Sequence, residues 1–170
     1  MKPFNLSSED ILLISTFPIC SEMTKEEIVT FSKHLTGIQF THEERIFEQE
    51  SKANDHLFII LGGEVYITTK LTGLKKELSI TNQRAGSIVG ILSFIDGRSH
   101  KASAYAFSPV RTVIVTRDIY QHFKDNHPRI ATKMLQYLIV SADDLACQFL
   151  NKLSASQEFM LGITTAKGKS

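Results

Sequence analysis

Residues 85–103 read AGSIVGILSFIDGRSHKAS, and the rest of the chain is organised around them. Gly86 and Gly90 flank one short apolar run, and a second apolar run at 91–95 is long enough for about one and a half helical turns. The basic run GRSHK follows at 97–101. Such a combination can hold a phosphate, because backbone N–H groups converge and a cation neutralises the charge. Solvated turns have the same composition, so this stretch by itself leaves both interpretations open.

The composition predicts a single cytoplasmic domain. The chain has 170 residues, of which 42% are hydrophobic, and a formal net charge of +1, which favours neither nucleic acid nor acidic partners. Cys20 and Cys147 have no metal-binding or redox spacing, which indicates a reducing compartment. We expect neither a signal peptide nor a membrane partner, because no apolar run approaches about 20 residues.

Two helices are predicted before the first strand. Residues 1–7 are expected to be irregular, and Ser8, Glu9 and Asp10 are expected to cap a short helix that Pro18 ends. Thr24 and Glu27 form a capping box at the start of the second helix. The apolar residues of that helix have 3–4 spacing, so one of its faces is expected to pack on a core.

From residue 37 the hydrophobic period changes from 3.6 to 2, which predicts strands. Two glycines at 62–63 separate the strands 56–61 and 64–69, which we interpret as a hairpin, and 72–73 is expected to form the next turn. The other expected strands are 38–40, 45–47, 77–80, 101–107 and 110–115, with the run between Gly86 and Gly90. About eight short strands at near-regular spacing indicate a β-sandwich or jelly-roll barrel.

After Arg117 the helical period returns. A short helix is expected at 118–125, then a long helix from Pro128 to about residue 153, with Asn126 as its N-cap. One apolar face of the long helix consists of Ile130, Met134 and Tyr137. The other has coiled-coil spacing and consists of Leu135, Leu138, Ala142, Leu145 and Phe149. This second face predicts a dimer seam, and the alternative is a single helix lying flat on the barrel.

We therefore predict a mainly β protein with flanking helices: an eight-stranded jelly-roll β-barrel with N-terminal helices and a long C-terminal helix. The expected segments are N-terminal helices at 1–36, a roll at 37–116 that contains the glycine-rich stretch 86–103, C-terminal helices at 117–153, and a flexible tail at 154–170.

Three motifs resemble one known family. Residues 45–49 read RIFEQ, similar to the family strand x-I-F-x-Q/E, and residues 57–65 read LFIILGGEV, similar to L-Y-I-I-L-x-G-x-V. Gly86 and Gly90 resemble the glycines of G-x-x-F-G-E. In this order they resemble the cyclic-nucleotide-binding domain, the family of the bacterial catabolite activator protein and the protein kinase A regulatory subunits. The resemblance implies a jelly roll whose phosphate-binding cassette reads G-E-L/I-A-L…P-R-A/S-A-T.

On this chain an ungapped alignment puts Gly90 at the glycine of the cassette, Ile91 at the glutamate, Ser99 at the proline and His100 at the arginine. The candidate ligand-binding residues that the resemblance implies are Gly90, Ile91, Leu92, Ser99, His100, Lys101 and Ser103.

The cassette is degenerate at two of these positions. In the family, the glutamate accepts a hydrogen bond from the ribose 2′-hydroxyl and the arginine binds the cyclic phosphate with two N–H groups. Ile91 can accept no hydrogen bond, which costs about 1–3 kcal/mol. His100 has at most two diverging donors and is mostly neutral near pH 7, which costs about another 2–3 kcal/mol. Together these losses weaken binding by about a thousandfold.

Other residues of the stretch offer partial replacements. Lys101 or Arg98 could supply a positive charge, and Ser99 or Ser103 could donate to phosphate oxygens. In an extended segment Ser99 and Lys101 lie on one side and His100 on the other, so His100 and Lys101 are not expected to reach the same anion.

No catalytic or metal site is expected. The six histidines include no i,i+4 helical pair, and the sequence has no nucleophile elbow, P-loop or Ser/His/Asp arrangement. Only about 17 residues follow Leu153, too few for a helix-turn-helix, so no DNA-binding domain and no direct nucleic-acid partner are expected.

Two functions fit the sequence. The first is a non-catalytic, stand-alone regulatory or adaptor module without a cofactor, which does not bind cyclic AMP in the usual way and acts as a homodimer or through a protein partner. The second is a small-ligand sensor that binds cyclic AMP, cyclic GMP or another anionic nucleotide through altered pocket contacts.

Overall fold

A computed structural model describes residues 1–52, 55–70 and 77–160. The strands are β1 (Lys2–Phe4), β2 (Thr36–Phe40), β3 (Arg45–Phe47), β4 (His56–Gly62), β5 (Val65–Lys70), β6 (Glu77–Gln83), β7 (Ile88–Val89), β8 (Ser103–Ala106) and β9 (Val110–Thr116). The helices are α1 (Ser8–Ser15), the 3-10 turn η1 (Pro18–Cys20), α2 (Lys25–Lys33), α3 (Ile91–Asp96), α4 (Arg117–Asn126) and α5 (Pro128–Met160).

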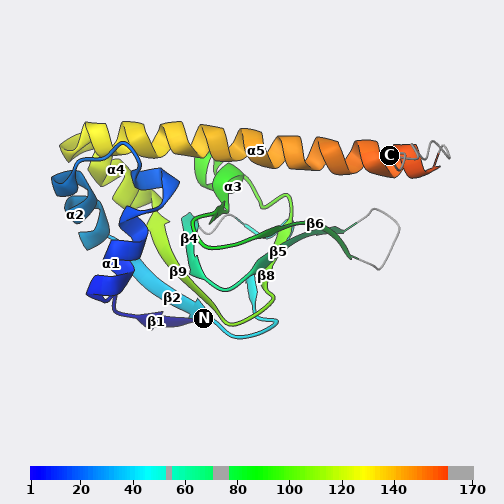
Figure 1. The fold of residues 1–170 in the computed structure, drawn as a ribbon, viewed down its shortest axis with the longest axis horizontal. Helices are drawn as coiled ribbons and strands as arrows, with labels where there is room; N and C mark the ends of the chain where they lie inside the picture. The colour runs from blue at the N-terminus through cyan, green and yellow to red at the C-terminus, as the bar shows by residue number, and fades with distance from the viewer. Residues whose placement is uncertain (53–54, 71–76, 161–170) are drawn as a thin grey trace, which may run out of the picture.

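The strands form two antiparallel sheets, with the orders β1-β2-β9-β4-β7 and β3-β8-β5-β6. In Figure 1, α1, α2 and α4 gather at one end of the molecule, and α5 runs along its whole length above the sheets. This arrangement confirms the predicted jelly roll with N-terminal helices and a long C-terminal helix.

Strand β4 has a core on each of its faces. Leu57, Ile59 and Leu61 pack in a cluster with the helices, whereas Phe58 and Ile60 pack inside the roll. Alternate side chains of a strand point to opposite faces, so both faces of β4 need apolar residues. This explains why the sequence is apolar without interruption from Leu57 to Leu61.

The predicted hairpin at 62–63 is wrong. Strand β4 pairs with β7 and β9, while β5 pairs with β6 and β8 in the other sheet, so the glycines carry the chain between sheets. Gly63 has φ 85°, and a Cβ on it would lie 2.4 Å from the Pro109 carbonyl oxygen. Hydrophobic alternation shows which face of a strand is buried but not which strand it pairs with. The turn expected at 72–73 lies outside the described residues.

The N-terminus is more ordered than expected. Strand β1 pairs with β2, with Phe4 opposite Gly37, and adds a ninth strand within the described residues. A Cβ on Gly37 would lie 2.6 Å from the Phe4 carbonyl oxygen, so glycine is needed for this pairing. Helix α1 is capped one residue earlier than expected, by Ser7, in a reciprocal capping box with Asp10.

The capping box of Thr24 and Glu27 at α2 is confirmed. The C-terminal helices, in contrast, differ from the prediction at their ends. Asn126 is not an N-cap, because α4 continues through it. Helix α5 continues to Met160, so the flexible tail expected from residue 154 is wrong as far as residue 160, and 161–170 lie outside the described residues.

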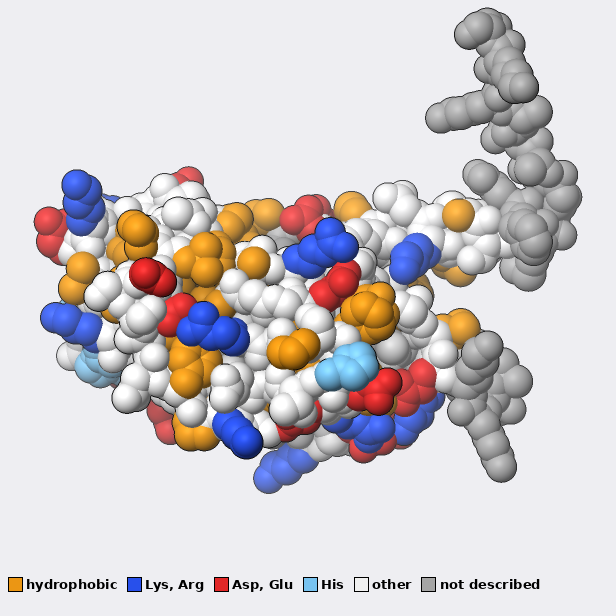
Figure 2. Space-filling view, turned by 60° about the horizontal axis from the view of Figure 1, so that its bottom comes forward, with side chains coloured by type: hydrophobic (Ala, Val, Ile, Leu, Met, Phe, Trp, Pro, Cys, Tyr) orange, Lys and Arg blue, Asp and Glu red, His pale blue; other side chains and the backbone are white. Residues whose placement is uncertain are grey.

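Two surface properties bear on function. Figure 2 shows acidic and basic side chains interspersed on the face that it draws, in keeping with a net charge of +1. None of the helices in the described ranges is both long and apolar enough to cross a membrane.

Candidate functional site

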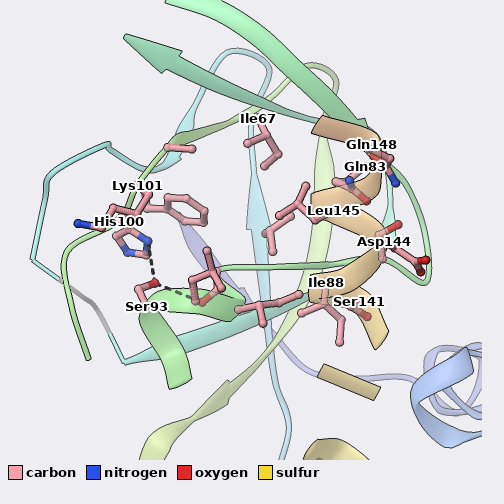
Figure 3. Close-up of a pocket in the computed structure, with 17 residues that line it drawn as sticks. Ile67, Gln83, Ile88, Ser93, His100, Lys101, Ser141, Asp144, Leu145 and Gln148 are labelled. Atoms are coloured by element: carbon pink, nitrogen blue, oxygen red, sulfur yellow. Dashed lines mark hydrogen bonds between the residues drawn. The ribbon is translucent and has the colours of Figure 1, made fainter. Parts of the chain in front are cut away.

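A cavity of about 200 Å³ lies between α3 and α5 (Figure 3). One wall is formed by α3 and the segment 100–102, and the opposite wall by α5. Ile67 and Val89 of the roll add apolar surface between these walls. The volume is somewhat below the roughly 300–1,000 Å³ of drug-sized ligand pockets, so the cavity fits a small molecule.

Two glycines in left-handed conformations hold α3 in place. Gly90 is its N-cap with φ 89°, and Gly97 is its C-cap with φ 70°. A Cβ on Gly90 would lie 3.0 Å from the carbonyl oxygen of His56, so β4 approaches the backbone closely here. Between the glycines, Ile91 and Phe94 are buried in the helical core. The sequence therefore dictates both ends of this short helix and the face that it buries.

The structure brings five of the seven predicted ligand-binding residues to the cavity. They are Gly90, Ile91, Leu92, His100 and Lys101. Ser99 does not line the cavity, and Ser103 is fully buried, where its hydroxyl oxygen accepts from the backbone N–H of Gln49 at 3.0 Å. The predicted alternation is confirmed in burial, since His100 is buried while Lys101 is exposed.

His100 is held on three sides. Its ring stacks on Phe47 with 4.1 Å between ring centroids and 11° between planes. Its Nδ1 lies 2.9 Å from the hydroxyl of Ser93, which in turn lies 3.2 Å from the carbonyl oxygen of Gly90. The backbone N–H of His100 donates to the carbonyl oxygen of Ser51, and the His100 carbonyl accepts from the N–H of Glu50. Only 3% of the residue is exposed.

These contacts determine the protonation of His100. Burial lowers the pKa of its imidazole below the ordinary value, so the ring is neutral at pH 7. The Ser93 hydroxyl has one proton, which it can donate either to the carbonyl oxygen of Gly90 or to Nδ1 of His100. Nε2 of His100 is buried and has no hydrogen-bond partner among the described residues. The side chain in the arginine position is therefore neither charged nor forked.

The basic side chains around the cassette are engaged elsewhere. Nε of Arg98 lies 2.8 Å from a carboxylate oxygen of Asp96. Lys101 is exposed, and its side chain extends away from the cavity in Figure 3. Arg98 does not line the cavity, and Lys101 lines it without directing its side chain into it, so the expected replacement of the lost positive charge is not seen in this geometry.

Arg117 joins the cassette to the C-terminal helices. It is the first residue of α4, and its Nη2 donates to the carbonyl oxygens of Ser93 and Phe94, at 3.0 and 2.8 Å, near the C-terminal end of α3. It also forms an ion pair with Asp55 at 3.3 Å. Cations near the last carbonyls of a helix are favourable, so this contact fixes α3 against the start of α4.

Several cavity residues are absent from the prediction. On α5 they are Ser141, Asp144, Leu145 and Gln148. Of these, only Leu145 is named in the prediction, where it belongs to the dimer seam and not to the ligand site. Positions 141, 145 and 148 share one helical face, and this spacing could have identified the wall. Phe47 and Ser93 were missed because contacts between distant segments leave no local signal.

The predicted dimer seam does not form one free face. Leu138 is 1% exposed, Ala142 packs partly against the helical core, and Leu145 lines the cavity. Leu135 and Phe149 are exposed. The reason is a shift in register: the face chosen from the sequence includes residues that α5 buries against its own roll.

A second set of α5 residues has heptad spacing, and its large side chains are exposed. We call it the outer α5 stripe, and it consists of Leu135, Ile139, Ala142, Ala146, Phe149 and Leu153, spaced 4, 3, 4, 3, 4. Four of these side chains are large and 40–60% exposed: Leu135, Ile139, Phe149 and Leu153. The stripe replaces Leu138 and Leu145 of the predicted seam by Ile139 and Ala146.

The described part of the chain contains no group of three or more His, Cys, Asp or Glu side chains that could hold a metal ion. His34 and His122 do approach each other, with ring centroids 4.8 Å apart.

Comparison with known proteins agrees with this geometry. The sequence profile described as "Cyclic nucleotide-binding domain" matches residues 38–127. A "CRP-like cAMP-activated global transcriptional regulator" of Mycobacterium tuberculosis is 27% identical over 111 residues, which cover 65% of this chain and 49% of the regulator. The chain thus spans about half the length of the curated relatives it matches.

Solved structures show the same fold. A cyclic nucleotide-binding domain from Methylobacillus flagellatus has a TM-score of 0.72 and 23% identity, covering 85% of this chain and 83% of that one. A regulatory subunit of a cAMP-independent protein kinase A from Trypanosoma cruzi, bound to guanosine, has a TM-score of 0.67 and 19% identity, covering 86% and 49%. Because the family profile spans more than half of the 170 residues and the fold agrees, the chain belongs to the cyclic nucleotide-binding domain family.

Proposed function

We propose that this chain is a non-catalytic regulatory or adaptor module that does not bind cyclic AMP or cyclic GMP through its cassette, and that it acts by pairing with a second copy or with a protein partner. The observation that carries the proposal is His100. A neutral imidazole, stacked on Phe47 and bonded to Ser93, stands where the family's cassette has an arginine.

The geometry strengthens the energetic argument against cyclic-nucleotide binding. The cyclic phosphate would have no charged fork, and Ile91, buried in the helical core, offers no acceptor to the ribose. Losing a charge-assisted hydrogen bond costs about 1.5–3 kcal/mol, and a buried hydroxyl without a partner about 1–3 kcal/mol. The two losses together are worth about three orders of magnitude in affinity.

Isothermal titration of the full chain with cyclic AMP and with cyclic GMP tests this proposal. We expect dissociation constants in the millimolar range or no measurable heat, because about 4 kcal/mol is missing from a contact set that otherwise gives micromolar binding. A dissociation constant of a few micromolar for either nucleotide would show that the proposal is wrong.

The outer α5 stripe supports self-association. It continues over almost three heptads and includes exposed Ile139 and Leu153, the kind of residues that fill coiled-coil core positions. Figure 1 shows the C-terminal half of α5 lying above β6, with no described element on the side of the helix that is turned away from the sheets. Pairing two copies of α5 would bury these side chains.

A ligand sensor is the second candidate, and the cavity favours it. The cavity joins the cassette to α5, so a molecule bound there would contact both the recognition segment and the helix that reaches a partner. The neighbouring structure from Trypanosoma cruzi holds guanosine, a nucleoside without a phosphate. The anionic nucleotide that the sequence suggested fits less well, because neither Arg98 nor Lys101 is directed into the cavity.

A further inference from the structure

The walls of the cavity between α3 and α5 are mainly apolar. Ile67, Val89 and Ile91 are at most 8% exposed, and Leu145 faces them from α5 (Figure 3). Phe47 lies at the cassette end. Such walls favour a flat or compact apolar body, and burying it removes water from both surfaces.

The charges around the cavity do not suit an anion. Arg98 is paired with Asp96, and Arg117 is bound to carbonyl oxygens of α3. Lys101 lines the cavity, but its side chain is exposed and extends away from the cavity in Figure 3. Asp144 on α5 is the acidic residue of the cavity lining. A phosphate here would lose its hydration and approach a carboxylate, and both effects oppose binding.

The α5 side of the cavity carries its own hydrogen-bonding groups. The hydroxyl of Thr81 donates a hydrogen bond to Oε1 of Gln148 at 2.7 Å, and this bond connects β6 to α5. Ser141 and Gln83 lie nearby, and the Asp144 carboxylate can only accept. A ligand that matches this wall presents hydroxyl or N–H donors to it.

We infer that the cavity binds an uncharged nucleoside, a ring system with hydroxyl and N–H donors and no phosphate. The inference rests on the second candidate function and names its ligand class. The base provides the flat apolar body, the donors satisfy the α5 wall, and the missing phosphate removes the group that the site cannot neutralise. The ligand would thus be uncharged, whereas the cassette of the family binds an anionic phosphate.

Titration of the full chain with two matched pairs, guanosine against cyclic GMP and adenosine against cyclic AMP, tests the inference. The members of a pair share base and ribose and differ in the phosphate. We expect at least one nucleoside to bind ten times or more tightly than its cyclic partner. Absence of binding by both nucleosides at 1 mM, or equal affinity within each pair, overturns the inference.

Two pairs of variants locate the site. Leu145→Trp fills the cavity and is expected to abolish nucleoside binding, whereas Val140→Trp places the same side chain on an exposed position outside the cavity and leaves it unchanged. Asp144→Lys adds a cation at the cavity and is expected to reduce the preference for the nucleoside at least threefold. Asp143→Lys changes the net charge equally at an exposed position that does not line the cavity.

The inference and the proposed function can be refuted separately. If Leu145→Trp and Val140→Trp bind a nucleoside equally well, the site lies elsewhere and the inference is wrong. If Asp144→Lys and Asp143→Lys shift the preference equally, the local charge argument is wrong. Micromolar binding of cyclic AMP or cyclic GMP refutes the proposed function, whereas absence of nucleoside binding alone leaves that function standing.

Discussion

At the scale of single residues, His100 makes the stability of the roll depend on pH. Burial lowers its pKa in the folded state, so between that lowered value and the ordinary one the unfolded chain binds more protons. The free energy of unfolding therefore falls as pH decreases through about 6.5. His56 acts in the same direction, since burial also lowers its pKa.

Chemical denaturation between pH 7.5 and 5.5 checks this prediction. We expect the wild type to lose stability with a slope of at most about 1.4 kcal/mol per pH unit for each proton taken up. His100→Gln is expected to show a smaller slope, because one of the two imidazoles with a lowered pKa is gone. His42→Gln, at an exposed position, is the control. Equal slopes for His100→Gln and the wild type would contradict the role of His100.

Restoring the two lost cassette contacts tests whether they alone prevent cyclic-nucleotide binding. The variant Ile91→Glu with His100→Arg is expected to bind cyclic AMP at least tenfold more tightly than the wild type. It should also be about 1–3 kcal/mol less stable, because both sites are tightly packed. Ser99→Arg adds the same cation outside the cavity lining and serves as the control in the titration. Unchanged affinity of the double variant would mean that the cavity itself excludes the nucleotide.

At the scale of elements, the conformation of α3 depends on Gly90. Gly90→Ala puts a side chain at φ 89° and 3.0 Å from the His56 carbonyl oxygen. We expect a loss of about 1–3 kcal/mol in the free energy of unfolding, measured in urea. Gly62→Ala, which meets nothing within 4 Å, should change it by less than about 0.5 kcal/mol. Equal losses in both variants would show that α3 does not need the left-handed glycine.

Elements with a strong local signal could be predicted from the sequence. The capping box at α2, the apolar run of β4 and the start of α5 at Pro128 follow from short-range patterns. The pairing of β5 with β8 and the existence of β1 could not be predicted, because pairing between distant segments leaves no pattern in the sequence of either segment.

The candidate site was predicted only on its cassette side. Gly90, Ile91 and His100 were found by alignment with a motif, whereas the α5 wall depends on how that helix is rotated about its axis. A one-residue shift in choosing the apolar face exchanged Leu138 for Ile139, and that shift separates a buried side chain from an exposed one.

At the scale of the whole molecule, the outer α5 stripe predicts a dimer. Ile139→Asp with Leu153→Asp is expected to convert it to a monomer by light scattering, because two carboxylates per chain would enter the apolar seam. Val140→Asp, exposed but outside the stripe, is the control and should leave the mass unchanged. A wild-type monomer, or a double variant that stays dimeric, would contradict the prediction.

The position of Arg117 has a consequence for how the cassette is coupled to the C-terminal helices. One guanidinium binds the last carbonyl groups of α3, and the same residue begins α4, which leads directly into α5. Phe94 of α3 also contacts Tyr120 of α4, with 6.0 Å between ring centroids, and Ile91 packs in the same core as α5. A displacement of α3 would therefore change contacts of both C-terminal helices at once.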